Sequence, residues 1–396
     1  MGTVCCASRN ASTPKAGGTD AGPVTARSRD ARLLRPDQVC RVVEGECMAT
    51  MKDVARVAKV SIATVSSALS GAAFVSPELK ARVDTAVQQL GYAPNSIASG
   101  LKRGTTTLLG LIVPDITNPF FTELIHVVQR RARAAGYSVL LCDSEQDVAR
   151  ELSLLRLMRS HLAAGTILCP TGPAAAYARV EDEIGTMALV AVDHALPGER
   201  YDTVVLDNIA AGLLATRHII AFGHKRIAAL VGPDYLLPAH GRLEGFFEAM
   251  RQAGLGTDAA LIREAGFQQD AAYTATCELL ARPERPTAIF VSNNHMLVGV
   301  MRAIAAAGLS CPADLSIAAV DDFPWATAFT PALTTVRQPV ESMAEAAIDS
   351  LLARIGGNKD RGRRQVMAPE LIIRNSCAAP RRMVATGSTR RRRPAP

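Results

Sequence analysis

The first regular spacing of apolar residues lies in residues 48–94, where three short helical patterns follow one another. Thr50 and Asp53 form a capping-box start for the first pattern. Ser61 can cap the second, and Ser76-Pro77 opens the third. The spacing predicts a small all-α bundle of three helices.

From residue 105 onward, short apolar runs of strand length alternate with helical patterns. The expected strands are 108–113, 137–141, 166–169, 187–192, 203–206, 226–231, 287–291 and 315–320. The expected helices are 118–136, 147–160, 208–222, 241–253, 293–307 and 340–355. Apolar strands alternating with helices predict parallel sheets covered on both faces. The segment is too long for one sheet, so we expect an α/β body of two doubly wound lobes over 105–376, with a ligand cleft between them.

The flanking segments lack these patterns. Residues 1–47 are rich in Ala, Gly, Ser, Thr and Arg, and we expect them to be disordered; Met48 offers an alternative start that would leave them untranslated. Residues 95–104 form a linker with a short helical pattern. Residues 377–396 contain six arginines and no acid, which predicts a basic disordered tail.

The net charge of +7 is unevenly distributed. Residues 48–104 contain seven Lys or Arg against three Asp or Glu, whereas the body at 105–376 has an excess of acids. A basic module on an acidic body indicates a polyanion partner for the small module only.

Several function classes are excluded by what the sequence lacks. No apolar run reaches the ~18 residues of a membrane span, and the first thirty residues lack a signal-peptide core. The nine cysteines include no C-x-x-C pair, so we expect no zinc site or disulfide framework, and a reducing cytoplasm fits best. Without a G-x-S-x-G, P-loop, H-E-x-x-H or dinucleotide motif, we expect no enzyme, cofactor or metal.

Residues 53–69 have the layout of a helix-turn-helix, two helices separated by a turn of three to four residues. The second helix of this motif can enter the major groove of double-stranded DNA. Short hydroxyls near a helix start can donate to phosphates, so we expect Ser61, Thr64 and Ser66 to contact the DNA backbone. Thr50 is a further expected DNA contact. The motif alone leaves open a helical hairpin that only packs.

Residues 49–104 closely resemble the lactose/galactose-repressor (LacI/GalR) family of bacterial transcription regulators. The resemblance rests on Lys52-Asp53-Val54-Ala55, Val60-Ser61, Thr64-Val65-Ser66, Gly91-Tyr92-Ala93-Pro94-Asn95 and Ala98 through Leu101. It continues to residue 376 through strings that include Asn118-Pro119-Phe120-Phe121, Gly223-His224-Lys225-Arg226-Ile227, Gly241-Arg242-Leu243-Glu244-Gly245-Phe246 and Thr330 to Val336. It implies a homodimeric repressor of a pseudo-palindromic operator, controlled by a small-molecule effector, a sugar or sugar acid.

The resemblance also assigns the DNA-reading residues. Ile62, Ala63 and Ser67 match the family's base-reading positions, where relatives usually carry larger polar or basic side chains. Ile62 and Ala63 can make only apolar contacts, such as with a thymine methyl, which leaves the operator sequence open. In the linker, Asn95, Ala98 and Leu101 match the family's hinge helix, whose leucine wedges into the minor groove. A plain apolar linker residue is the alternative for the leucine.

In the body, four polar residues at predicted strand ends match positions that hydrogen-bond sugar hydroxyls in sugar-responsive relatives: Asp193, Arg242, Asn293 and Asp321. Phe120, Phe121 and Trp325 are expected as apolar walls of the same site. Acids at such positions can instead be loop or cap residues. His194 is interpreted as a solvated loop histidine, and whether Phe267 or Gln268 faces the ligand stays open.

Two other functions are compatible with a two-lobed body. A solute-binding protein for transport would need an export signal and no DNA module, and a sugar-processing enzyme would need a catalytic pair; the sequence favours neither. Residues 377–396 contain no leucine, so the leucine heptad that joins some relatives into tetramers is absent and we expect a dimer.

Overall fold

The computed structural model describes residues 49–70, 74–92 and 106–381. The chain divides into two compact units, Met1–Pro94 and Asn95–Pro396, and each is described by itself. The expectations for residues 1–47 and 95–104 lie outside the described residues, as do those for residues 382–396 of the basic tail.

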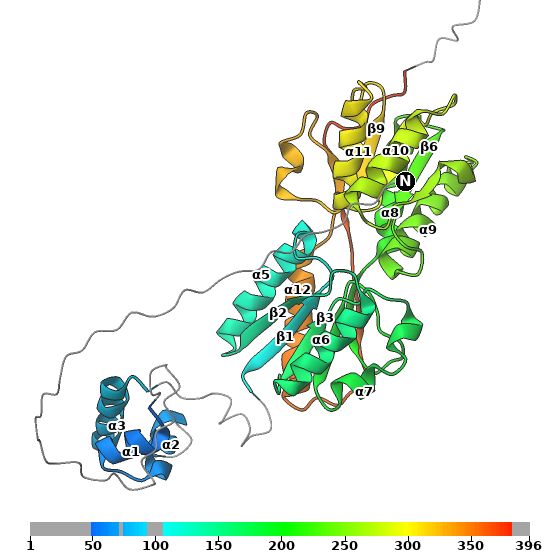
Figure 1. Cartoon of the computed structure of the whole chain (residues 1–396). Coiled ribbons are helices and arrows are strands. Elements are labelled where there is room, and N and C mark those ends of the chain that lie inside the picture. The colour runs from blue at the N-terminus through cyan, green and yellow to red at the C-terminus, as the bar shows by residue number, and fades with distance from the viewer. Residues whose placement is uncertain (1–48, 71–73, 93–105, 382–396) are drawn as a thin grey trace, which may run out of the picture. The chain divides into compact units, whose positions relative to one another are not determined.

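The first unit contains the three predicted helices: α1 (Met51–Ala58), α2 (Ile62–Ser70) and α3 (Pro77–Leu90). Their apolar stripes meet in one core, in which Val54, Val65 and Val83 are fully buried. Ser76 caps α3 by accepting a hydrogen bond from the Leu79 N–H, and Pro77 occupies the first helical position. The predicted all-α bundle is confirmed (Figure 1).

The second unit contains two six-stranded sheets, each the centre of one lobe. The first sheet has the order β11-β5-β4-β3-β1-β2, and all its pairs are parallel. Its strands are β1 (Leu108–Val113), β2 (Ser138–Asp143), β3 (Gly165–Leu168), β4 (Ala188–Val192), β5 (Asp202–Leu206) and β11 (Arg364–Met367). Successive side chains face opposite sides, so Leu111 packs with α5 (Pro119–Ala134) and α12 (Val340–Ile355), and Ile112 packs with α6 (Val148–Ser160) and α7 (Val180–Ile184).

The second sheet has the order β12-β10-β9-β8-β6-β7. Its strands are β6 (Ile227–Val231), β7 (Ile262–Glu264), β8 (Ala288–Val291), β9 (Ser316–Val320), β10 (Thr334–Arg337) and β12 (Glu370–Ile372). One face packs with α8 (Asn208–Ala221) and α9 (Leu237–Gln252), the other with α10 (Gln269–Leu280) and α11 (Asn294–Ala306) (Figure 1). Short 3-10 helices span Ala174–Tyr177, Ala259–Leu261 and Pro324–Thr327.

The chain passes between the two sheets three times: from β5 to α8, from β10 to α12 and from β11 to β12. Both lobes are therefore built from segments far apart in the sequence. The last passage takes only two residues, so no helix reverses the chain, and β12 pairs antiparallel with β10. The other pairings of this sheet are parallel, so the predicted α/β lobes with parallel sheets are confirmed.

The sequence pattern missed two helices and four strands, and it misplaced one helix start. Strands β7, β10, β11 and β12 have three or four residues, too few for a clear period, and β7, β11 and β12 are not fully buried. Helices α7 and α10 were missed, and α9 begins at Leu237 rather than at residue 241. No helix among the described residues is long and apolar enough to cross a membrane.

Candidate functional site

The turn between α1 and α2 is fixed by the backbone conformation of Lys59 and by the side chain of Arg82. Lys59 adopts a left-handed backbone conformation, with φ 53° and ψ 47°, that ends α1. Arg82, on α3, donates from Nη2 to the carbonyl oxygens of Ala58 and Lys59 at 2.6 and 3.1 Å. The guanidinium thus satisfies carbonyls that a helix end leaves open, and it holds the start of α2 in place.

The start of α2 is exposed in the way a groove-reading helix requires. Ile62 is 46% exposed, and Ser61 and Ala63 are exposed beside it, whereas Thr64, Ser66 and Ser67 are half-buried. Ser61 Oγ accepts from the Thr64 N–H at 3.0 Å and caps the helix. Ile62 lies outside the hydrophobic core of its unit, so its exposed part is available for an apolar contact with another molecule.

Thr50 has a local structural role in addition to the DNA contact predicted for it. Its N–H and hydroxyl both donate to Asp53 Oδ2, at 3.0 and 2.6 Å, and these bonds hold the pKa of Asp53 below its ordinary value. The predicted hinge residues Asn95, Ala98 and Leu101 lie outside the described residues.

The second unit contains a cleft with about 780 Å³ of empty space, part of it open to solvent, lined by residues from both lobes. Six of the seven residues predicted to bind the effector line it, namely Phe120, Phe121, Asp193, Arg242, Asn293 and Asp321. Trp325 does not line it. Its side chain is 51% exposed and lies 5.4 Å from the Phe323 ring, centroid to centroid, because the 3-10 helix after β9 turns it away.

Arg242 and two aspartates form the polar centre of the cleft. Arg242 Nη1 lies 3.6 Å from Asp321 Oδ2, and both side chains are almost completely buried. Burial raises the pKa of Asp193 to about 6; the positive charge of Arg242 opposes this rise, and the charge of Asp321 adds to it. The cleft lining contains three acidic side chains, Asp115, Asp193 and Asp321, against one guanidinium.

Close packing of α8 against α9 positions Arg242. A Cβ at Gly245 would lie 2.1 Å from the Ile209 carbonyl oxygen, and one at Gly212 would lie 2.0 Å from the Arg242 carbonyl oxygen, so only glycine permits this approach. The approach brings Arg242 Nε to Asn208 Oδ1 at 3.0 Å and Nη1 to the Ser292 carbonyl at 2.6 Å. No described residue accepts a hydrogen bond from Nη2, which is left for a ligand.

Helix starts from the two lobes meet across the cleft. Asn118 caps α5 and Asn293 caps α11, each through its Oδ1 atom. The adjacent Asn294 donates from Nδ2 to Asn118 Oδ1 at 3.2 Å, and His295 Nδ1 lies 3.4 Å from Asp115 Oδ2. These contacts join the lobes along one side of the cleft.

His194 is buried rather than solvated, which corrects the sequence interpretation. Only 4% of it is exposed, and its Nδ1 accepts from the Leu237 N–H, across the cleft, at 3.1 Å. The start of α9 has no side-chain cap of its own, so this imidazole takes that place. Burial lowers the pKa of His194, which favours the neutral ring that can accept.

Aromatic rings supply the apolar part of the cleft. Phe120 and Phe121 meet edge to face, with centroids 4.9 Å apart. Phe267, rather than Gln268, lines the cleft; its φ is 59°, and its ring lies where a Cβ at Gly232 would be, within 2.4–2.6 Å. The missing side chain at Gly232 makes room for that ring.

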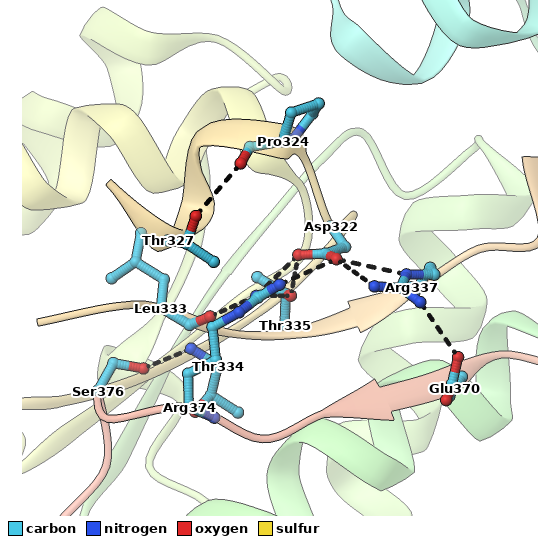
Figure 2. Close-up of polar contacts among 10 residues, drawn as sticks. All are labelled: Asp322, Pro324, Thr327, Leu333, Thr334, Thr335, Arg337, Glu370, Arg374 and Ser376. Atoms are coloured by element: carbon cyan, nitrogen blue, oxygen red, sulfur yellow. Dashed lines mark hydrogen bonds and ion pairs between the residues drawn. The ribbon is translucent and has the colours of Figure 1, made fainter. Parts of the chain in front are cut away.

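The strand end that bears Asp321 is held by the next residue, Asp322 (Figure 2). Its carboxylate accepts from Arg374 at 2.8 and 3.1 Å, from Arg337 at 3.0 and 3.3 Å and from Thr335 Oγ1 at 2.7 Å. Burial opposes ionisation, but these hydrogen bonds outweigh it and hold the pKa of Asp322 below its ordinary value. Arg337 Nη1 also lies 3.5 Å from Glu370 Oε2, so the network joins β10 to β12. These are the strands where the chain leaves the second lobe for α12 and returns to it from β11.

Comparisons with known proteins follow the same division into two units. Residues 50–95 match the profile of "Bacterial regulatory proteins, lacI family", and residues 216–377 match "Periplasmic binding protein-like domain". The ribose operon repressor of Escherichia coli (strain K12) is 37% identical over 330 residues, which cover 83% of this chain and 100% of that protein. The chain belongs to the LacI family. It is a DNA-binding transcriptional regulator with an effector-binding body, not an enzyme.

The chain is also similar to other repressors and regulators, over 69–84% of its length. The transcriptional repressor PurR of Photobacterium profundum is 33% identical over 329 residues, 83% of this chain and 98% of that protein. A lac repressor dimer bound to operator and the anti-inducer ONPF superposes with a TM-score of 0.75 at 26% identity, over 84% of this chain and 100% of that one. A regulator from Alkaliphilus metalliredigens QYMF complexed with D-xylulofuranose has a TM-score of 0.61 at 27% identity, over 69% of this chain and 99% of that one.

Several cleft residues carried no signal in the sequence. Thr171, His295 and Gln338 line the cleft but lie in no motif, and Gln338 Nε2 donates to Asp321 Oδ1. Asn118 was recognised only as a helix start. The described part of the chain contains no group of three His, Cys, Asp or Glu residues placed to hold a metal ion.

Proposed function

We propose that this LacI-family regulator binds a neutral sugar in the cleft of its body and thereby controls its affinity for operator DNA. The observation that carries the proposal is the convergence of Asp193, Arg242 and Asp321 on one cleft that also has aromatic walls. Carboxylates accept from sugar hydroxyls, the free Nη2 of Arg242 donates to them, and aromatic rings pack on the C–H faces of a sugar.

Charge favours a neutral sugar over a sugar acid. A ligand carboxylate would meet three acids and one arginine in the cleft. Two of the five N–H donors of that arginine are already used by Asn208 and Ser292, and its Nη1 lies 3.6 Å from Asp321. Burying an uncompensated negative charge is costly, whereas hydroxyls can both donate and accept. Of the two effector classes expected from the sequence, a sugar and a sugar acid, we therefore propose the neutral sugar.

For the DNA-binding unit we propose a homodimer that reads a pseudo-palindromic operator with two copies of α2. The exposed Ile62 and Ala63 would contact base edges, with Ser67 beside them, and the hydroxyls of Thr50, Ser61, Thr64 and Ser66 would contact phosphates. The hinge segment 95–104, with Asn95, Ala98 and Leu101, would enter the minor groove at the operator centre. We propose the cytoplasm as the location, since the operator DNA that a transcriptional regulator binds lies there.

Calorimetric titration of the full chain tests the ligand class. The panel pairs D-ribose with D-ribonate and D-glucose with D-gluconate, so that each pair differs in one carboxylate. We expect at least one of the two neutral sugars to bind. Its Kd should be tenfold or more below that of the sugar acid paired with it. Binding of an acid in preference to its neutral partner, or of no panel member at all, would overturn the proposed ligand class.

A further inference from the structure

One wall of the cleft is fixed by a buried carboxylate that does not itself line the cleft. Pro170 and Thr171 form this wall, immediately after β3. Glu151, in the first turn of α6, is fully buried behind it. Glu151 makes no ion pair with a lysine or arginine among the described residues.

The partners of Glu151 all belong to the wall segment and to the 3-10 helix that follows it. Its Oε2 accepts from the Thr171 N–H at 3.1 Å and from the Thr171 hydroxyl at 2.9 Å, and its Oε1 accepts from the Tyr177 hydroxyl at 2.6 Å. The Tyr177 oxygen accepts in turn from the N–H groups of Thr171 and Gly172, both at 2.9 Å.

These bonds use every hydrogen-bond donor of the wall. Pro170 has no N–H, and the Thr171 N–H, the Thr171 hydroxyl and the Gly172 N–H all point to Glu151 or Tyr177. A ligand at this wall therefore finds no free hydrogen-bond donor of residues 170–172, only acceptor atoms and apolar surface. Such a wall accepts from a hydroxyl or packs against C–H groups, and it offers nothing to a carboxylate or phosphate.

Close packing around Gly172 fixes the position of the cleft wall against α6. A Cβ at Gly172 would lie 2.5 Å from Val148 Cγ2 and 3.3 Å from the Tyr177 hydroxyl, so the wall lies directly on the first turn of α6. Burial raises the pKa of Glu151 to about 7, opposed by its hydrogen bonds to Tyr177 and Thr171. Burying a carboxylate without a cation is costly, and here the carboxylate accepts only from Thr171 in the cleft wall and from the Tyr177 hydroxyl.

We propose that Glu151 and Tyr177 are positioning residues of the effector pocket, which turn the donors of residues 170–172 away from the ligand and so select a neutral, hydroxyl-bearing or apolar ligand face. The inference about selectivity rests on the proposed function of the cleft. The local arrangement of the wall is testable without any ligand.

Hydrogen–deuterium exchange of the ligand-free full chain tests the wall directly. In Glu151→Gln, an NH2 group replaces one of the two carboxylate oxygens that accept from Thr171 and Tyr177. In Tyr177→Phe, the hydroxyl that accepts from the N–H groups of Thr171 and Gly172 is removed. Exchange at the amides of Thr171 and Gly172 should accelerate at least tenfold in both variants, with no change in peptides of the other lobe. Thr276→Val is the matched control, because the buried Thr276 hydroxyl bonds only to the Ala272 carbonyl of its own helix.

Unchanged exchange at residues 171 and 172 in Glu151→Gln would overturn the proposal, as would equal acceleration throughout the protein, since that would mark a general loss of stability. Titration with D-ribose and D-ribonate adds the readout of selectivity: the preference for the neutral sugar should shrink at least fivefold in Glu151→Gln and stay constant in Thr276→Val. A wild-type protein that binds neither compound would count against the proposed ligand class. The exchange data would still show whether Glu151 and Tyr177 hold the amides of Thr171 and Gly172.

Discussion

Asp193 and Asp321 occupy equivalent positions in the two lobes of the body. Asp193 follows β4, and its N–H donates to Val204 of β5; Asp321 follows β9, and its N–H donates to Val336 of β10, both at 2.9 Å. Both have left-handed backbones, with φ of 67° and 73°. Each lobe thus contributes one carboxylate to the cleft from the same place in its sheet, where ligands of parallel sheets usually bind.

Replacing Arg242 by lysine should abolish most effector binding. A lysine has one nitrogen and cannot keep the bonds from Nε to Asn208 and from Nη1 to Ser292 while presenting a further donor to the ligand. We expect a loss of about 100-fold in affinity for the neutral sugar, or roughly 3 kcal/mol, measured by calorimetry. Arg251→Lys is the control, since Arg251 lies on the same helix but is exposed and pairs with Glu248. Equal losses in both variants would contradict the role of Arg242.

The stability of the protein should carry a pH dependence from Glu151. Its pKa is raised from 4.5 to about 7, so between these values the folded state keeps a proton that the unfolded state releases. This contribution to stability is complete below pH 4.5 and is lost as the pH rises through 7, by up to about 3 kcal/mol. Relative to wild type, Glu151→Gln should therefore gain stability over that range in urea unfolding. A constant difference between the two proteins would show that Glu151 does not titrate there.

Gly245→Ala should destabilise the body strongly. The new Cβ would lie 2.1 Å from the Ile209 carbonyl oxygen and 2.7 Å from the Leu213 nitrogen, so α8 and α9 would have to separate. We expect a loss of about 3 kcal/mol in the free energy of unfolding, together with weaker ligand binding, because Arg242 is on the same helix. Gly256→Ala, where a Cβ meets nothing within 4 Å, should be close to neutral.

Ile62→Ala should weaken operator binding without affecting folding. The side chain is 46% exposed and lies outside the core of the first unit, so little apolar burial is lost. An apolar contact with a base edge contributes about 1 kcal/mol or more, so binding to the operator should fall at least fivefold in fluorescence anisotropy. Gln89→Ala, exposed on α3, is the control. Undiminished operator affinity in Ile62→Ala would remove this residue from the reading surface.

Leu101→Ala addresses the hinge, which lies outside the described residues. If this leucine wedges into the minor groove, its loss should reduce operator affinity strongly and leave sugar affinity nearly intact. Gel-shift titration and calorimetry on the same preparation measure both quantities. Equal operator binding by the variant and the wild type would refute the wedge.

The sequence predicted those parts of the molecule that local patterns determine. The three-helix bundle, the alternation of strands and helices, and Asp193 and Asp321 at strand ends all follow from short-range spacing and from the family resemblance. The contact of Asn118 with Asn294 joins residues 176 positions apart, and the cap that His194 supplies to α9 comes from the other lobe, so neither has a local signature. Trp325 was predicted to line the cleft but does not, because it lies in a 3-10 helix whose geometry points its side chain elsewhere. The spacing of residues in the sequence carries no signal for that geometry.

The central claim is that occupancy of the cleft changes operator affinity. The most direct measurement is fluorescence anisotropy of the full chain on labelled DNA from upstream of its own gene, with and without a saturating neutral sugar whose binding calorimetry has established. We predict that the sugar changes the operator Kd at least fivefold, a coupling of about 1 kcal/mol, and that Arg242→Lys removes the change. An operator Kd that is identical with the cleft empty and filled would contradict the account.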